Sequence, residues 1–229
     1  MKKFLTVLMI LGFTGSVFAQ KTYIQAGINL ANITKTNDGG TEDNNVLTSF
    51  NVGLMHRFGL SPIVDLEAGL LFTGKGSKAE TFFGSNDYYV KTKFNPFYLE
   101  VPLNVLVKVP IGLGTKLFFN AGPYIAIGVA GKSKVDTKVG PLQSNREQSI
   151  DFSNDDPFTS QQDDAAYDKL KRFDFGVNLG GGLAFKRLIL KANYGLGLSK
   201  INSTESDNNA NDKNKFRTVS ISVGIPIGK

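Results

Sequence analysis

Six of the charged side chains lie inside segments of the chain that are rich in apolar and small residues. An isolated charge in a low-dielectric interior is very costly, so cations and carboxylates in such segments are expected to pair. We interpret these six as a lumen charge cluster, which plugs a narrow barrel with salt bridges. The same residues could instead line a gate or an ion path. They are Arg57, Asp65, Glu67, Glu100, Lys108 and Lys191.

Residues suited to catalysis or to metal binding are scarce. The chain has one histidine, His56, and no cysteine, which excludes thiol catalysis and thiolate metal sites. A lipid-modifying enzyme built on a histidine–serine pair would need a serine beside His56, and the sequence pattern places none there. We therefore predict no catalytic site, no metal site and no enzyme activity.

Two kinds of stretch could hold a ligand, but each lacks a required feature. Residues 69–76, "GLLFTGKG", have the spacing of a phosphate-binding loop, but Gly76 replaces the Ser or Thr and no helix follows. The acidic stretches "NDGGTEDNN" and "ESDNNANDKN" lack the spacing of an EF-hand loop. No cofactor is predicted.

Four aromatic residues interrupt the polar stretch that follows residue 74. They are Phe82, Phe83, Tyr88 and Tyr89. Aromatic residues at this place fit a girdle at the membrane interface. They fit equally well a surface-loop recognition patch that contacts a partner.

The elements that must position these residues alternate with a period of two. In eight segments, one parity is apolar and the other is polar or small, as in strands with one buried and one exposed face. Each segment is long enough for a tilted membrane crossing, which takes about 9–11 residues. The segments are residues 23–34, 48–58, 64–74, 98–109, 117–130, 173–185, 188–200 and 216–227.

The stretch "YLEVPLNVLVKV", residues 98–109, raises the question of which face points inward. Its odd positions are all aliphatic, whereas its even positions include Glu100, Asn104 and Lys108. The polar faces of the eight segments are rich in Gly, Ser and Asn, and the narrow lumen of an eight-stranded barrel needs small residues. We therefore place the polar face inside and the aliphatic face against lipid.

The connections between the eight segments alternate between long and short, and the long ones hold nearly all Asp and Glu. Short periplasmic turns and long extracellular loops are typical of up-and-down outer-membrane barrels. The sequence thus predicts an all-β fold, an eight-stranded antiparallel transmembrane β-barrel. The longest loop is expected at residues 131–172, with a short helix at 157–170.

The first 19 residues have the pattern of a secretory signal peptide. Two lysines precede a short apolar run, and "VFA" ends at Ala19, so we expect cleavage there and a barrel domain over residues 20–229. The formal net charge of +6 includes the two signal lysines and is spread along the chain. This mild excess does not favour nucleic acid as a partner.

Several stretches together resemble a known family. "YIQAGINLANIT", "YLEVPLNVLVKV", "NAGPYIAIGVAG" and "DFGVNLGGGLAFK" are similar to porin-family outer-membrane β-barrel proteins, the small barrels that include type IX secretion accessory barrels. The resemblance implies the bacterial outer membrane of a Gram-negative cell as the location. It implies outer-membrane lipid as one partner and an outer-membrane or secretion-system protein as another.

We expect a closed structural or interaction barrel that displays its surface loops to a partner. The alternative is a small porin-like channel for solutes, because the family name does not establish conduction. The two differ in whether a continuous water path runs through the lumen.

Overall fold

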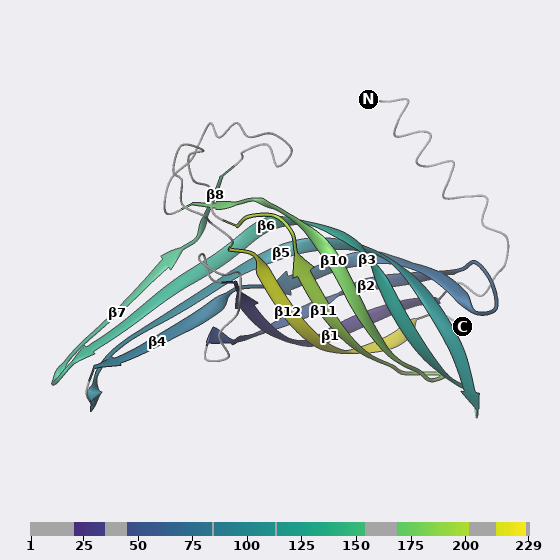
Figure 1. The fold of residues 1–229 in the computed structure, drawn as a ribbon, viewed down its shortest axis with the longest axis horizontal. Helices are drawn as coiled ribbons and strands as arrows, with labels where there is room; N and C mark the ends of the chain where they lie inside the picture. The colour runs from purple at the N-terminus through teal and green to yellow at the C-terminus, as the bar shows by residue number, and fades with distance from the viewer. Residues whose placement is uncertain are drawn as a thin grey trace.

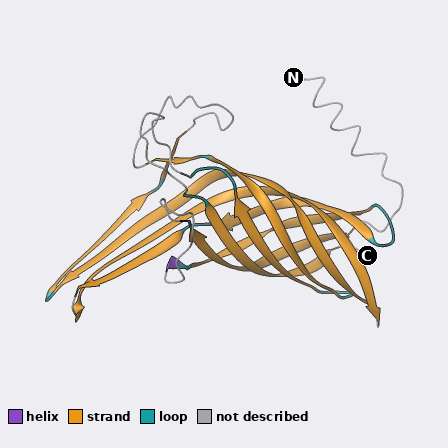
Figure 2. Ribbon diagram, viewed as in Figure 1, coloured by secondary structure: helices purple, strands orange, loops and turns teal. Residues whose placement is uncertain are grey.

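The structure, a computed structural model, describes residues 21–34, 45–83, 85–112, 114–153, 169–201 and 214–227. Nearly all of them form antiparallel β-strands, and eight of these strands close into a barrel (Figure 1, Figure 2). The predicted eight-stranded antiparallel barrel is therefore confirmed. In order around the ring, the strands are β1 (Lys21–Ile33), β2 (Leu47–Gly59), β3 (Val64–Gly74), β5 (Ser85–Gly112), β6 (Thr115–Val139), β10 (Phe173–Ala184), β11 (Ile189–Gly197) and β12 (Phe216–Ile227), which pairs with β1.

The two faces of each barrel strand differ as the alternation predicts. On β5, Val105 is 49% exposed, whereas Tyr98 and Asn104 are fully buried. The aliphatic face thus lies on the outside of the barrel, and the polar face lies in the lumen. Hydrophobic side chains that stay exposed around a closed barrel are what a lipid-facing wall requires.

Strands β5 and β6 are much longer than predicted, at 28 and 25 residues. Beyond the barrel rim they pair with each other and with two further strands, β4 (Ser77–Phe83) and β7 (Leu142–Ser149). We call this four-stranded extension the arm; it comprises β4, residues 85–97 of β5, residues 130–139 of β6, and β7. Figure 1 shows the arm projecting far beyond the rest of the barrel. We call this end of the barrel the arm end, and the opposite end, with the short connections, the turn end.

The arm corrects two predictions about loops. The stretch after residue 74 and the first part of 131–172 are strands rather than loops. Residues 132–139 read "KSKVDTKV", which alternates charged residues with Ser, Thr and Val. This pattern has period two but lacks a strongly apolar face, so it resembled a polar loop.

A short parallel pair, β8 (Asp151–Ser153) and β9 (Lys169–Lys171), lies beside the arm end of the lumen. The helix predicted at 157–170 falls almost wholly outside the described residues, and its last two positions belong to β9. The predicted signal peptide, residues 1–19, also lies outside the described residues. Within the described residues, no helix is both long and apolar enough to cross a bilayer.

Two apolar layers fill the lumen. The layer toward the turn end contains Tyr23, Met55, Leu71, Leu106, Phe118 and Ile189. The layer toward the arm end contains Tyr98, Tyr124, Ala126, Ile201 and Phe216, with Ile33 and Phe152 packed against it. The space between and around these layers holds the charged residues.

Candidate functional site: the lumen and the arm

A single carboxylate, that of Glu67 on β3, organises the lumen toward the turn end. Arg57 Nε from β2 and the Tyr23 hydroxyl from β1 each donate to its Oε2 at 2.7 Å. Lys191 from β11 pairs with Oε1, and Asn104 Nδ2 from β5 donates to the same oxygen at 3.4 Å. Glu67 is fully buried. Side chains from four other strands therefore meet on one buried carboxylate. We call Arg57, Glu67 and Lys191 the turn-end triad.

A separate ion pair lies next to the turn-end triad. Lys108 Nζ is 2.5 Å from Asp65 Oδ1, and both side chains are largely buried. The two residues help to line an open hollow of about 290 Å³ at the turn end, together with Arg57. Asp65 and Lys108 thus neutralise each other near the mouth of the barrel.

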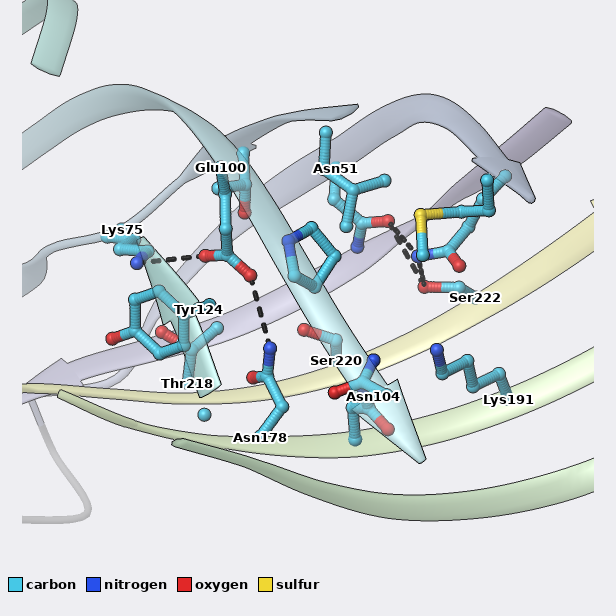
Figure 3. Close-up of a pocket in the computed structure, with 17 residues that line it drawn as sticks. Asn51, Lys75, Glu100, Asn104, Tyr124, Asn178, Lys191, Thr218, Ser220 and Ser222 are labelled. Carbon is cyan, nitrogen blue, oxygen red and sulfur yellow. Dashed lines mark hydrogen bonds and ion pairs between the residues drawn. The ribbon is translucent and has the colours of Figure 1, made fainter. Parts of the chain in front are cut away.

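A second cluster lies toward the arm end and is built around Lys75, directly after β3. Lys75 Nζ is 2.7 Å from Asp174 Oδ2 and 3.0 Å from Glu100 Oε2. The hydroxyls of Ser199 and Tyr124 donate to Asp174, at 2.5 and 3.1 Å. Lys75 is only 3% exposed, and Figure 3 shows it pointing at Glu100. We call Lys75, Glu100 and Asp174 the arm-end triad.

Aromatic rings surround the Lys75 ammonium group. Its Nζ lies 4.1 Å from the centre of the Tyr124 ring and 5.4 Å from that of Tyr98. The Phe216 ring centre is 6.0 Å away. A buried ammonium group is attracted to the faces of such rings. The lysine is therefore held by two carboxylates and by the arm-end apolar layer.

The structure divides the predicted lumen charge cluster. It brings Arg57, Glu67 and Lys191 together, and it pairs Asp65 with Lys108. Glu100 does not join them, because it belongs to the arm-end triad with two residues that the sequence analysis did not select. Lys75 and Asp174 carried a signal, since each has the inward parity of its strand. Lys75 follows the last residue of the segment 64–74, so the alternation alone does not place it in a strand.

The charges of the two triads are complementary. The turn-end triad has two cations and one carboxylate, and the arm-end triad has one cation and two carboxylates. With Asp65 and Lys108 included, the charges of these eight residues sum to zero. The eight residues are thus neutral as a set, whereas neither triad is neutral by itself.

A polar cavity of about 40 Å³ separates the triads (Figure 3). Lys75 and Glu100 reach it from the arm-end triad, and Lys191 reaches it from the turn-end triad. Its wall also carries an amide and hydroxyl network, in which Asn51 accepts a hydrogen bond from the Ser222 hydroxyl at 3.1 Å. A polar cavity of this volume holds about three water molecules. The cavity is therefore a small polar chamber between the two triads.

His56 lies on the outer face near the turn end. Its Nδ1 is hydrogen bonded to Thr22 Oγ1 at 2.7 Å, and its ring lies 4.3 Å from that of Phe58. These contacts fit a histidine at the membrane interface. Among the described residues, no group of three His, Cys, Asp or Glu side chains is arranged to hold a metal ion.

The aromatic residues predicted as a surface-loop recognition patch lie on strands and not in a loop. Phe82 and Phe83 end β4, and Tyr88 and Tyr89 are on the arm part of β5. A different aromatic group, Phe50, Phe72 and Phe97, packs together at the rim. Tyr89 is eight residues beyond Phe97, or about 26 Å along the strand. This distance is too great for a girdle at the same membrane interface.

The far end of the arm is apolar and exposed. Val139 is paired with Tyr88 and with Leu142, across the tight turn at Gly140, so these side chains are neighbours. Gly140 has φ +58°, which a glycine adopts without strain. We call the exposed apolar residues here the tip: Phe82, Phe83, Tyr88, Val139 and Leu142, which are 44–74% exposed.

An exposed ion-pair network joins β6 and β7 nearer the rim. Lys132 and Lys134 each lie 2.5 Å from Glu147. Hydrogen bonds from these two lysines lower the pKa of Glu147 to about 2. The hydrogen bond to Glu147 also raises the pKa of Lys134. Glu147 and Lys134 are therefore both charged at neutral pH.

A comparison with known protein families agrees with this architecture. A family model described as "Outer membrane protein beta-barrel domain" matches residues 18–203. The attachment invasion locus protein Ail of Yersinia pestis, solved with the heparin analogue sucrose octasulfate, is 15% identical, with a TM-score of 0.42; the match covers 92% of this chain and 100% of that one. Neisserial surface protein A is 13% identical, with a TM-score of 0.42, and the match covers 90% and 97%. No curated protein sequence matches the chain.

Proposed function

Because this chain belongs to the outer-membrane β-barrel domain family, we propose that it is a closed, non-enzymatic barrel of the bacterial outer membrane that presents the tip of its arm to a partner. Long connections of outer-membrane barrels face the outside of the cell. The arm then projects away from the membrane. A leading signal peptide over residues 1–19 is part of this proposal.

The observation that carries the proposal is the combination of a filled lumen with an exposed apolar tip. The lumen is crossed by two apolar layers and two buried triads, with a chamber of only about 40 Å³ between them. At the tip, Phe83 is 61% exposed and Leu142 is 74% exposed. Exposed apolar surface outside the lipid-facing wall marks a site of interaction. An outer-membrane or secretion-system protein is the kind of partner that we propose.

The porin-like alternative is tested by conductance. We expect the refolded mature chain to produce no stable current steps in a planar lipid bilayer, because the triads and apolar layers leave no continuous water path. Insertion must be shown separately, by the mobility difference between folded and unfolded protein on a gel. Reproducible steps at modest voltage from protein shown to be inserted would establish a channel and contradict the closed lumen.

The role of the tip is tested by site-specific photo-crosslinking in intact cells. A photoreactive residue at Phe83 or Leu142 is expected to give the same discrete adduct with one protein. The same residue at Asn145, on the polar part of β7, should give little of this adduct. Replacing two of the three other tip residues by serine, as Phe82→Ser and Val139→Ser, should lower the adduct yield severalfold, since apolar contact area is lost. Adducts that do not depend on position or on these replacements would contradict the proposal.

A further inference from the structure

The two faces of the arm differ in charge. Successive side chains of each arm strand point to opposite faces. We call the face that is continuous with the lipid-facing side of the barrel wall the outer face of the arm. Outer-face charges comprise six lysines against three carboxylates, a net charge of +3. The lysines are Lys78, Lys91, Lys93, Lys132, Lys134 and Lys138, and the acids are Glu80, Asp136 and Glu147.

Three of these lysines form one row across three strands. Lys93 on β5 is the register partner of Lys78 on β4 and also of Lys134 on β6. Side chains directly opposite each other on antiparallel strands have Cβ atoms about 4.5–5.5 Å apart, and like charges at these positions are destabilising. We call Lys78, Lys93 and Lys134 the lysine row. The next row has a different composition, because Lys91 is flanked by Glu80 and Asp136.

The acidic groups of this face do not neutralise the lysine row. Glu80 is shared between Lys78 and Lys91, at 3.4 and 3.7 Å. Glu147 is shared between Lys132 and Lys134, as described above. Among the described residues, the exposed Lys93 has no carboxylate within ion-pair distance. An open hollow of about 490 Å³ lies here, lined by Lys93, Lys134, Asp136, Asn145, Arg146 and Glu147.

The height of the lysine row relates it to the membrane. The apolar outer face ends with Phe97, whose ring stacks on that of Phe72 at 5.1 Å. Lys93 is four residues beyond Phe97, or about 13 Å along the strand and roughly 10 Å in height for a tilted strand. Lipid headgroups occupy about 5–8 Å above the hydrocarbon on each side. A lysine side chain can extend back toward this layer.

We propose that the lysine row binds the phosphate groups of an outer-leaflet glycolipid of the lipid A type. A phosphate between the strands would relieve the repulsion among the three ammonium groups through charge-assisted hydrogen bonds. The lipid is favoured over a soluble anion because the row is on the face that continues the lipid-facing wall. This inference goes beyond the proposed function, since it does not involve the partner at the tip.

The test measures how fast an amine-reactive ester acetylates Lys93 in the full mature chain. The protein is placed in phosphatidylcholine nanodiscs that contain lipid A, dephosphorylated lipid A or neither. Only in the discs that contain lipid A do we expect acetylation of Lys93 to be slower, by roughly fivefold or more relative to the other two discs. The reason is that phosphate holds the lysine in its unreactive ammonium form. Lys186, at the turn end, serves as the internal reference. Equal rates in the three discs would overturn the proposal.

Two variants with the same charge loss separate the row from the general charge of the face. Lys78→Gln/Lys134→Gln should abolish the protection of Lys93 by lipid A. Lys91→Gln/Lys138→Gln removes two lysines from the same face but outside the row, and should retain the protection. If both variants lose the protection of Lys93, lipid A is attracted by the overall charge of the face, and the assignment of a binding site to the lysine row is wrong. If millimolar pyrophosphate protects Lys93 and lipid A does not, the anion is soluble and the lipid assignment is wrong.

Discussion

Replacing Glu67 by glutamine is expected to lower the free energy of unfolding by about 3–5 kcal/mol, because Arg57 and Lys191 would remain buried without their counter-ion. Both cations are at most 5% exposed. The measurement is urea unfolding of the refolded protein in lipid vesicles, followed by far-UV circular dichroism, since the chain has no tryptophan. Electrophoretic mobility of the folded and unfolded forms provides a second readout.

Two control variants show whether charge is the cause. Glu147→Gln removes a carboxylate that also bridges two lysines, but on the exposed arm, where such pairs contribute about 0–1 kcal/mol. Arg57→Met/Glu67→Leu/Lys191→Met replaces the turn-end triad with apolar side chains, a change that is often neutral or stabilising. If this triple variant were as unstable as Glu67→Gln, lost packing and not unpaired charge would explain the effect.

Lys75→Gln is expected to have an effect of similar size, about 3–5 kcal/mol, at the other end of the lumen. Without the ammonium group, Glu100 and Asp174 become two buried carboxylates with no cation between them. The loss should also loosen the aromatic side chains that contact Lys75, including Tyr124. The same urea unfolding reports the stability, and near-ultraviolet circular dichroism reports the packing of the tyrosines.

Asp174→Asn is the matched comparison for Lys75→Gln. It removes one charge from the same triad but leaves Lys75 paired with Glu100 at 3.0 Å. Its cost should therefore be clearly smaller than that of Lys75→Gln. Equal costs for the two variants would mean that Asp174 alone neutralises Lys75, and that Glu100 contributes little.

The barrel could be predicted well from the sequence because the pattern that specifies each barrel strand lies within that strand. Alternation along each strand fixes which side chains face lipid, and β3 (Val64–Gly74) and β12 (Phe216–Ile227) were predicted to the residue. The arm was missed because its strands carry charges on one face and Ser, Thr and Val on the other, a pattern that does not distinguish a solvated strand from a polar loop.

The division of the lumen charges could not be predicted, because pairing across the lumen depends on height and on register. Glu100 has the same parity as Lys108, yet they belong to different groups. Lys75 meets Asp174, a residue 99 positions away along the chain. Parity gives the face on which a side chain lies but does not identify its partner across the barrel.

The triads have a consequence for how the barrel is assembled. Glu67 meets Arg57 on the adjacent strand, but Lys191 follows it by 124 positions. Lys75 likewise lacks its partner Asp174 until β10, which carries Asp174, has been added to the sheet. A partly inserted sheet of the first strands would hold charges in the membrane without their counter-ions. Contacts between such distant parts of the chain slow folding, because the intervening chain must be closed into a loop first. The paired charges of the lumen therefore stabilise the complete ring relative to a partly formed one.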